Sequence, residues 1–361
     1  MRYHRPSRRP AALHFAMINT SPQTDAPKVS VVIPCFNLGQ YLDEAVESVL
    51  QQHFGDFEII VINDGSTDPA TNALLASYVR PKTRVMSTEN RGLARARNLG
   101  ISMSRGQYVC TLDADDKLHP AHLERTVRVL DENPALSFAS MWLQAFGGED
   151  WIWKQERCDL PTLLGECTVC TAALMRASAL RAVGGFDEGM PDQGYEDWDL
   201  WITLVASGYE GTIIPEVLFY YRRRAGSMSS ICCFGEPHQR LTRYLVEKHR
   251  DSYDRHMIDV LLRKERDLSE VLRTNLETER HIQTSLVPEV NRRREELASL
   301  DQKLLRAEEE RALRLDRDQL AARVAELESA IVKVFGSTSW KLTAPLRAVY
   351  DAFHRVMDGK E

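Results

Sequence analysis

Apolar runs alternate with helical patterns along residues 29–112. The runs are almost continuously hydrophobic, which is typical of strands buried on both faces of a sheet, and they lie at residues 29–33, 58–62, 83–87 and 107–112. Between them, apolar side chains recur at helical spacing in segments 41–52, 69–79 and 93–104. This alternation predicts a mostly parallel α/β sheet with right-handed crossovers, in which Pro34 ends the first strand.

Residues 134–230 have a more mixed pattern. A helix is expected at Glu196–Ser207, and short strands are expected at Cys170–Arg176, Gly211–Ile214 and Leu218–Arg222. Five of the six tryptophans fall in this part of the chain, namely Trp142, Trp151, Trp153, Trp198 and Trp201. Core packing is one interpretation of such a group, and a wall that stacks on sugar rings is the other.

A stretch without glycine separates Gly235 from Gly336. Apolar residues recur within it at alternating spacings of four and three, as in Leu320, Val324, Leu327, Ile331 and Val334, and a similar series begins at Leu297. The pattern predicts a long helical extension, with Pro288 in the first turn of a second helix. An oligomer-forming coiled coil is our first interpretation, and a helical hairpin within one chain is the alternative.

The two ends of the chain differ from the rest. Residues 1–28 contain four arginines together with Pro, Ser and Thr, and we expect a disordered basic tail. Residues 336–361 are expected to form an amphipathic helix that binds a membrane surface or packs on protein, because apolar side chains share one face at Leu342, Leu346, Val349, Phe353 and Val356. A globular domain at 29–235 and a helical extension at 236–335 complete the expected division.

Charge and cysteine content narrow the class of protein. Fifty-two acidic and 46 basic side chains give a formal net charge of −6, which argues against a nucleic-acid partner. Of the 45 residues from Glu289 to Lys333, 21 are charged, so the extension carries much of this charge. No run of 18 apolar residues is present to span a bilayer. Without a convincing secretion signal, the seven cysteines are expected to be free thiols rather than a zinc site at Cys167 and Cys170.

Polar clusters follow each of the first four predicted strands, at residues 34–37, 63–66, 90–92 and 113–116. Because the carboxyl ends of parallel strands share one edge of a sheet, these clusters are expected to form one ligand site. Asp113, Asp115 and Asp116 would repel one another there unless they bind a cation. Mg²⁺ or Mn²⁺, completed by phosphate oxygens, fits such hard ligands. A solvated turn or a helix cap is the alternative.

Three further segments supply candidate chemistry. Asp64 can accept hydrogen bonds from a base or a ribose, and the arginine-rich helix start at 90–98 favours phosphate. An ordinary turn and a charged surface helix would leave the same patterns. Glu196 and Asp197 open a predicted helix, where the helix dipole stabilises carboxylates in any case. The chemical interpretation is a general base that removes a proton from an attacking hydroxyl.

Six segments, in this order, resemble glycosyltransferase family 2. They read VVIPCFN at 31–37, VINDGSTD at 61–68, ENRGLARARN at 89–98, LDADD at 112–116, VGGFDE at 183–188 and YEDWDL at 195–200. The resemblance covers about residues 29–230. It implies a GT-A fold, a sugar-nucleotide donor, a divalent cation and transfer with inversion at the anomeric carbon.

The same resemblance implies roles for individual residues. The donor would contact Pro34, Phe36, Asn37, Asp64, Arg97, Asn98, Asp113 and Asp115, with Mn²⁺ or Mg²⁺ on Asp113 and Asp115. The catalytic base would be Asp197, with Glu196 beside it. The acceptor would lie near Asp187, Glu188 and Trp198. Residues 29–133 would then form the nucleotide-binding half of the domain, and residues 134–235 the acceptor half.

One position departs from the family pattern. Many members have a histidine ahead of a Gly-Ser-Met-Ser run, whereas this chain has Arg224. If that histidine helps to bind the metal elsewhere, we expect either weaker metal affinity here or direct contact of Arg224 with the diphosphate.

The resemblance also suggests partners and a location. A glycan or lipid-linked glycan is the expected acceptor, in cell-surface polysaccharide synthesis, for a cytoplasmic homo-oligomer at the inner face of the membrane. Two other interpretations remain open. One is a nucleotidyltransferase, although no glycine- and lysine-rich phosphate loop follows the first strand. The other is a non-catalytic coiled-coil scaffold with a nucleotide-sensing domain.

Overall fold

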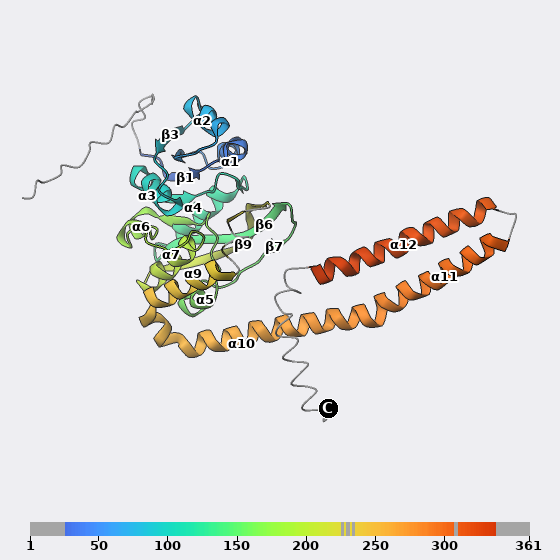
Figure 1. The fold of residues 1–361 in the computed structure, drawn as a ribbon. Helices are drawn as coiled ribbons and strands as arrows, with labels where there is room; N and C mark the ends of the chain where they lie inside the picture. The colour runs from blue at the N-terminus through green and yellow to red at the C-terminus, as the bar shows by residue number, and fades with distance from the viewer. Residues whose placement is uncertain (1–25, 225–226, 229–231, 233–234, 307–309, 337–361) are drawn as a thin grey trace, which may run out of the picture. The chain divides into compact units, whose positions relative to one another are not determined.

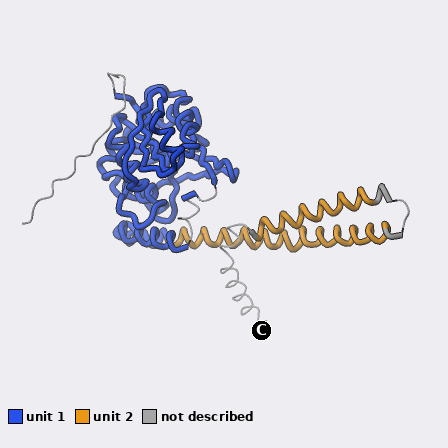
Figure 2. The backbone as a smooth tube through the Cα atoms, turned by 45° about the horizontal axis from the view of Figure 1, so that its top comes forward, with its two compact units in different colours: residues 1–260 blue, residues 261–361 orange. Residues whose placement is uncertain are grey.

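The computed structural model describes residues 26–224, 227–228, 232, 235–306 and 310–336. The chain divides into two compact units between Val260 and Leu261 (Figure 2). The first unit includes helix α9 (Gly235–Lys248), which the sequence pattern assigned to the extension. The expected basic tail and the expected amphipathic helix at 336–361 lie almost entirely outside the described residues.

Four parallel strands form one half of the sheet of the first unit, in the order β3-β2-β1-β4. They are β1 (Val29–Cys35), β2 (Phe57–Asp64), β3 (Thr83–Thr88) and β4 (Tyr108–Thr111). Helices α1 (Gly39–Leu50), α2 (Pro69–Ala76) and α3 (Leu93–Met103) connect them (Figure 1). Every residue of β1 and β2 is buried, which confirms the predicted parallel α/β arrangement with helices on both faces.

The first strand does not end at Pro34 as expected. It continues through Pro34 to Cys35, and Pro34 is paired with Ile62 of β2. On its other side, β1 pairs with β4 only over Val29–Val32. Pro34 therefore lies past the last β1–β4 pair, where the missing N–H removes no hydrogen bond between those strands.

The other half of the sheet continues in the order β8-β6-β9-β5, with β7 paired to β6. These strands are β5 (Lys117–Leu118), β6 (Leu136–Gly147), β7 (Ile152–Trp153), β8 (Leu174–Arg176) and β9 (Glu210–Arg223). The long strand β6 was not predicted, and β9 replaces two expected strands. The register between β6 and β9 shifts from Ile214 to Val217, so Pro215 falls in an irregularity that a continuous strand tolerates.

Two apolar cores cover the two faces of this sheet. Val31 and Ile33 of β1 point into one core, together with residues of α1 and α4 (His122–Glu132), whereas Val32 points into the other. The second core contains α3, α5 (Leu160–Gly165), α6 (Ala177–Ala182) and α7 (Glu196–Ala206). Trp201 of α7 is fully buried there, with its ring 5.1 Å from that of Phe138. This packing fixes α7, whose first turn carries the candidate base.

The second unit is helical. Helix α10 (Arg250–His281) enters it and leads through a π-helical turn, η1 (Ile282–Leu286), into α11 (Val287–Arg306). Pro288 lies in the first turn of α11 as predicted, and the helical segment from α10 to α11 continues without a break. Since proline removes a hydrogen-bond donor from the helical ladder, the wider π turn accommodates it.

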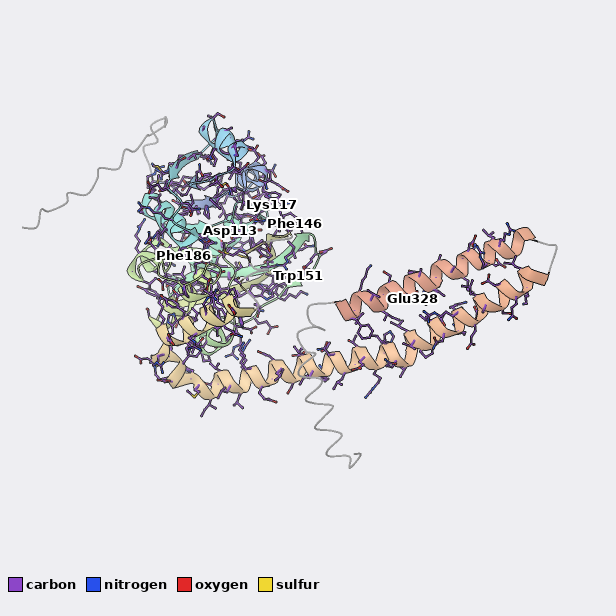
Figure 3. The ribbon with its side chains drawn as sticks, viewed as in Figure 1. Asp113, Lys117, Phe146, Trp151, Phe186 and Glu328 are labelled. Atoms are coloured by element: carbon purple, nitrogen blue, oxygen red, sulfur yellow. The ribbon has the colours of Figure 1, made fainter. Side chains whose placement is uncertain are left out.

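Helix α12 (Glu310–Gly336) runs back along α11 (Figure 1). Val324 and Leu327 of the predicted apolar series are buried in this contact, and Glu328 forms an ion pair with Arg294 of α11 (Figure 3). The structure thus has the intrachain hairpin that was the alternative interpretation. Self-association through the extension stays a prediction. Among the described residues, the helices are too short or too polar to cross a membrane.

Candidate active site

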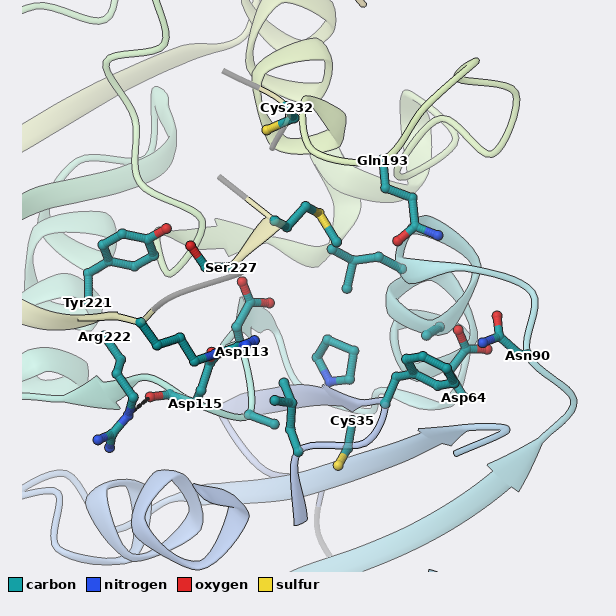
Figure 4. Close-up of a pocket in the computed structure, with 18 of the residues that line it drawn as sticks. Cys35, Asp64, Asn90, Asp113, Asp115, Gln193, Tyr221, Arg222, Ser227 and Cys232 are labelled. Atoms are coloured by element: carbon teal, nitrogen blue, oxygen red, sulfur yellow. Dashed lines mark hydrogen bonds and ion pairs between the residues drawn. The ribbon is translucent and has the colours of Figure 1, made fainter. Parts of the chain in front are cut away.

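The polar clusters at the ends of the parallel strands meet around one cavity of about 520 Å³. Pro34 lies near the end of β1 and Phe36 follows it, Asp64 ends β2, Asn90 follows β3, and Asp113 and Asp115 follow β4. Figure 4 shows Asp113 and Asp115 at one end of this cavity, called the strand-end cavity below, and Asp64 with Asn90 at the other. The parallel register therefore brings together five strand-end side chains predicted to contact a donor.

Two arginines neutralise the carboxylates that follow β4. Arg97 of α3 donates to Asp113 Oδ1 from Nη2 at 2.7 Å, and Arg224 donates to Asp115 Oδ2 from Nε at 2.7 Å. Arg97 is only 3% exposed, so the residues packed around its side chain hold it in the site. Burial raises the pKa of Asp115, and the hydrogen bond from Arg224 opposes that rise. These carboxylates are thus paired with cations, which excludes a freely solvated acidic turn.

The third aspartate of this cluster has a structural role. Asp116 is fully buried, and its Oδ1 accepts a hydrogen bond from the backbone N–H of Arg222 at 2.7 Å. Its Oδ2 has no hydrogen-bond partner within the described part of the chain, and burial raises its pKa well above the ordinary value. Arg222 Nε also donates to the backbone oxygen of Asp115 at 2.7 Å. These two hydrogen bonds attach the end of β9 to residues 113–116, which we call the carboxylate loop.

Asp64 shapes the other end of the cavity. Its two carboxylate oxygens accept the backbone N–H groups of Arg91 and Gly92 at 2.9 and 3.0 Å. Gly65, with φ of 63°, follows at a point where a Cβ would lie 2.3 Å from the backbone nitrogen of Asn90. Only glycine permits both the left-handed conformation and this close approach of the two loops. Asn37, which is predicted to contact the donor, lines neither this cavity nor the second one described below, and its Oδ1 accepts the backbone N–H groups of Thr67 and Asp68, both at 2.8 Å.

A second cavity of about 330 Å³ adjoins the first, and Asp113, Leu93, Tyr221 and Met228 line both. Trp151 and Trp153 contribute aromatic surface to it, and Glu196 and Asp197 contribute carboxylates. Two of the five clustered tryptophans thus line a cavity, whereas Trp201 is in the core. Trp151 is 39% exposed on the turn before β7 (Figure 3).

Asp197 has the environment of a proton acceptor. It lies in the first turn of α7, and its Oδ1 accepts the backbone N–H of Trp198 at 2.8 Å. Burial raises the pKa of Asp197 to about 6, although the nearby positive charge of Arg97 works against that rise. Burial also raises the pKa of Glu196, whose Oε2 accepts the backbone N–H of Gly194 at 2.8 Å. A carboxylate that titrates near 6 is mostly ionised at pH 7 and is a better base than an ordinary aspartate.

A buried ionic cluster attaches α7 to α9 and to His249, the residue between α9 and α10. Asp199 is 2% exposed and accepts from Lys248 Nζ and His249 Nε2, each at 2.7 Å. Lys248 also pairs with Asp187, which accepts a further hydrogen bond from the Tyr244 hydroxyl at 2.8 Å. These contacts hold the helix that carries Asp197, so residues beyond 235 support the site.

The remaining predicted site residues lie outside both cavities. Asn98 bonds to both backbone groups of Phe186, its Nδ2 donating at 2.8 Å and its Oδ1 accepting at 2.8 Å, and it also donates to Glu188. Asp187 faces α9, as described above. Trp198 donates its indole N–H to the backbone oxygen of Leu163 at 2.6 Å and packs on Tyr195. Their assignments to donor or acceptor stay predictions, and their visible contacts position loops and helices.

Several lining residues received no role from the sequence. Asp192, Gln193 and Ser227 line the strand-end cavity, and Tyr221 and Met228 line both cavities. Tyr221 lies on β9 and Gln193 in the loop before α7, far in sequence from the strand-end clusters. No local pattern marks such positions, because the fold alone returns these segments to the edge of the first four strands.

Solved structures share this fold. The mannosyltransferase PcManGT from Pyrobaculum calidifontis, in complex with GDP-Man and Mn²⁺, aligns with a TM-score of 0.51 at 16% identity and covers 94% of this chain and 89% of its own. S. aureus TarS 1–349, in complex with UDP-GlcNAc, aligns with a TM-score of 0.51 at 19% identity over 61% of this chain and 64% of its own. The sheet order, the flanking helices and these alignments define a GT-A fold with a helical extension.

Sequence comparison places the chain within that class. The model of the family described as Glycosyl transferase family 2 matches residues 30–183. An uncharacterized glycosyltransferase of Haemophilus influenzae is 34% identical over 232 residues, which are 57% of this chain and 69% of the relative. The chain belongs to glycosyltransferase family 2. Its match spans only about a quarter of two longer relatives, 28% of one from Rickettsia bellii and 23% of one from Sinorhizobium fredii.

Proposed function

We propose that this protein transfers a sugar from a nucleotide-sugar donor to a hydroxyl group of an acceptor, with inversion at the anomeric carbon. The observation that carries the proposal is the pair of adjoining cavities with Asp113 on both: one has the strand-end carboxylates, and the other has a carboxylate whose pKa is raised to about 6. A donor with its diphosphate beside Asp115 would place its sugar toward the second cavity. Residues 29–133 would mainly bind the nucleotide, and residues 134–235 the acceptor.

The chain's own residues would carry the proton and orient the reactants. Asp197, ionised at neutral pH, would accept the proton of the acceptor hydroxyl as its oxygen attacks the anomeric carbon. Arg97 would hold the Asp113 carboxylate in position, because their ion pair is almost completely shielded from water on the arginine side. The attack would come from the side opposite the leaving diphosphate, which inverts the configuration. Glu196, fixed by the N–H of Gly194, would hold the first turn of α7 in place.

A divalent cation fits Asp113 and Asp115 if the donor supplies further ligands. Within the described ranges, no group of three or more histidine, cysteine, aspartate or glutamate residues is arranged to bind a metal. The protein would therefore contribute two carboxylates, and phosphate oxygens and water the rest, as is usual for Mg²⁺. When bound, such an ion neutralises charge on the departing diphosphate. We accordingly propose Mn²⁺ or Mg²⁺ at this position.

The second cavity suggests a sugar-bearing acceptor. Indole rings stack on the apolar faces of sugar rings, and a carboxylate nearby can receive the hydroxyl proton. We propose a glycan or a lipid-linked glycan, and family membership is the support for a cell-surface polysaccharide made at the inner face of the membrane. The helix predicted to touch that membrane lies beyond the described residues.

A thermal-shift screen tests the donor assignment. We expect one class of sugar nucleotide to raise the unfolding temperature in the presence of Mn²⁺, since a ligand at about 100 times its Kd stabilises the folded state by about 2.7 kcal/mol. Asp115→Asn should lose most of this shift. Asp43→Asn, which removes a carboxylate on α1 that pairs with Arg80 outside the cavity, should keep it. Absence of any nucleotide-dependent shift in the wild type would refute the proposal, and binding without transfer to any acceptor would favour the scaffold.

Replacing Trp151 by alanine tests the acceptor assignment. We expect the KM for the acceptor to rise about threefold to tenfold, because aromatic stacking contributes roughly 0.5–1.5 kcal/mol. Slow hydrolysis of the donor in the absence of acceptor should stay unchanged. Trp142→Phe is the matched control, since the Trp142 indole donates to the backbone of Gln155 and is not part of the cavity lining. An unchanged acceptor KM in Trp151→Ala would show that the acceptor binds elsewhere.

A further inference from the structure

A guanidinium group already occupies the carboxylate to which the proposed metal would bind. Arg224 Nε donates to Asp115 Oδ2 at 2.7 Å, and both side chains line the strand-end cavity. The Asp115 side chain is 14% exposed and that of Arg224 is 31% exposed. This contact is therefore partly shielded from water, and solvent screens it less than a surface ion pair.

Two cations on one carboxylate would oppose each other. A guanidinium and a divalent ion on the two oxygens of Asp115 would lie within about 5 Å, where like charges repel strongly at the effective dielectric of a partly buried site. Asp113 does not provide the metal with a carboxylate free of a competing cation, because Arg97 already donates to it and is buried. A metal that binds Asp115 must then displace Arg224, and the displaced guanidinium needs another anion.

The donor can supply that anion. A diphosphate in the same cavity presents several oxygens to a guanidinium, which binds phosphate in a two-pronged geometry. Arg224 is suited to such a movement because it follows the last residue of β9 and keeps part of its side chain in water. Arg222 differs, since its Nε and backbone N–H are both bound to the carboxylate loop. The loop would therefore stay in place while Arg224 moves.

We propose that Arg224 and the divalent cation compete for Asp115, so that the metal enters together with the donor, whose diphosphate takes over the displaced guanidinium. Metal and nucleotide then bind cooperatively, and each raises the affinity of the other by the same factor. In the metal-free protein Arg224 is the cation bound to Asp115. This inference rests on the proposed metal position at Asp115.

Binding of Mn²⁺, followed by the electron paramagnetic resonance signal of the free ion, tests it without any measurement of turnover. Wild type, Arg224→Met and Arg224→His would each be titrated alone and with UDP or GDP. We expect the wild type to bind Mn²⁺ weakly when alone and at least about tenfold more tightly with nucleotide. Both variants should bind Mn²⁺ alone about tenfold more tightly than the wild type, as loss of a charge-assisted competitor predicts.

Two controls separate the ways in which the inference can fail. Arg223→Met removes the same charge from the neighbouring residue, which pairs with Glu149, and should leave Mn²⁺ affinity within about twofold of the wild type. Asp115→Asn should abolish tight binding in every background. Equal Mn²⁺ affinity of wild type and Arg224→Met, with loss in Asp115→Asn, would overturn the competition but leave the metal site. Binding that does not depend on Asp115, or no binding even with nucleotide, would overturn the metal site and the competition together.

Discussion

Asp197→Asn is expected to lower kcat for sugar transfer by roughly a thousandfold, since general-base catalysis contributes on the order of 10²–10⁴ in rate. Asparagine has nearly the same shape and its oxygen can still accept the N–H of Trp198, so the first turn of α7 should keep its structure. What it cannot do is accept a proton from the attacking hydroxyl. Initial rates at saturating donor and acceptor, measured at pH 7.5, provide the comparison.

The pH dependence of the wild type is the companion measurement. Transfer needs Asp197 ionised, and burial raises its pKa from 3.8 to about 6. kcat/KM should therefore be level above pH 7 and fall toward tenfold per pH unit below pH 6, about two units above the fall expected for an ordinary aspartate. The residual rate of Asp197→Asn should not show this fall below pH 6. Unchanged nucleotide-dependent stabilisation of the variant shows that its donor site is intact, and near-wild-type transfer would exclude Asp197 as the base.

Arg97→Met is expected to reduce the free energy of unfolding by roughly 3–5 kcal/mol, the range for breaking a buried ion pair from one side. The methionine fills similar space but leaves Asp113 without its partner. It also removes the positive charge that holds down the pKa of Glu196 and of Asp197. The carboxylates of Asp113, Glu196 and Asp197, which line the second cavity, would then face one another without a buried cation. Urea unfolding at pH 7.5 measures the loss of free energy of unfolding. The fall of any residual activity at low pH should begin at a higher pH than in the wild type.

Arg95 of the same helix provides the matched control. It pairs with Glu188, but its side chain is 48% exposed, so Arg95→Met should cost less than about 1 kcal/mol. Arg97→Lys should recover part of the stability, since it restores the charge without the planar geometry of guanidinium. Equal stabilities of Arg97→Met and Arg95→Met would show that the ion pair with Asp113 contributes little and that Arg97 serves only to fill space.

The sequence predicted the first half of the fold well because its signals are local. Buried parallel strands are continuous apolar runs, and each of the four predicted strands and three predicted helices up to residue 112 is present with its ends shifted by a few residues. Strand β6 was missed. Strand β9 was predicted as two separate strands, because it contains Pro215 and local patterns do not show that an irregular register accommodates a proline. The same limit applies to the extension, where one apolar repeat is compatible with a partner helix from either the same chain or another.

By itself, the sequence determined that polar and acidic side chains follow four parallel strands and that a second acidic group opens a helix, because side-chain type and spacing are properties of a short segment. Only the tertiary structure decided which side chains contact these polar and acidic groups. It set Arg97 on Asp113, Arg224 on Asp115 and Lys248 on Asp199, contacts between residues 16, 109 and 49 positions apart. It also left Asn98, Asp187 and Trp198 in contacts that support loops and helices. Long-range pairs depend on the packing of whole elements, and burial there, rather than residue type, raises the pKa of Asp197 to about 6.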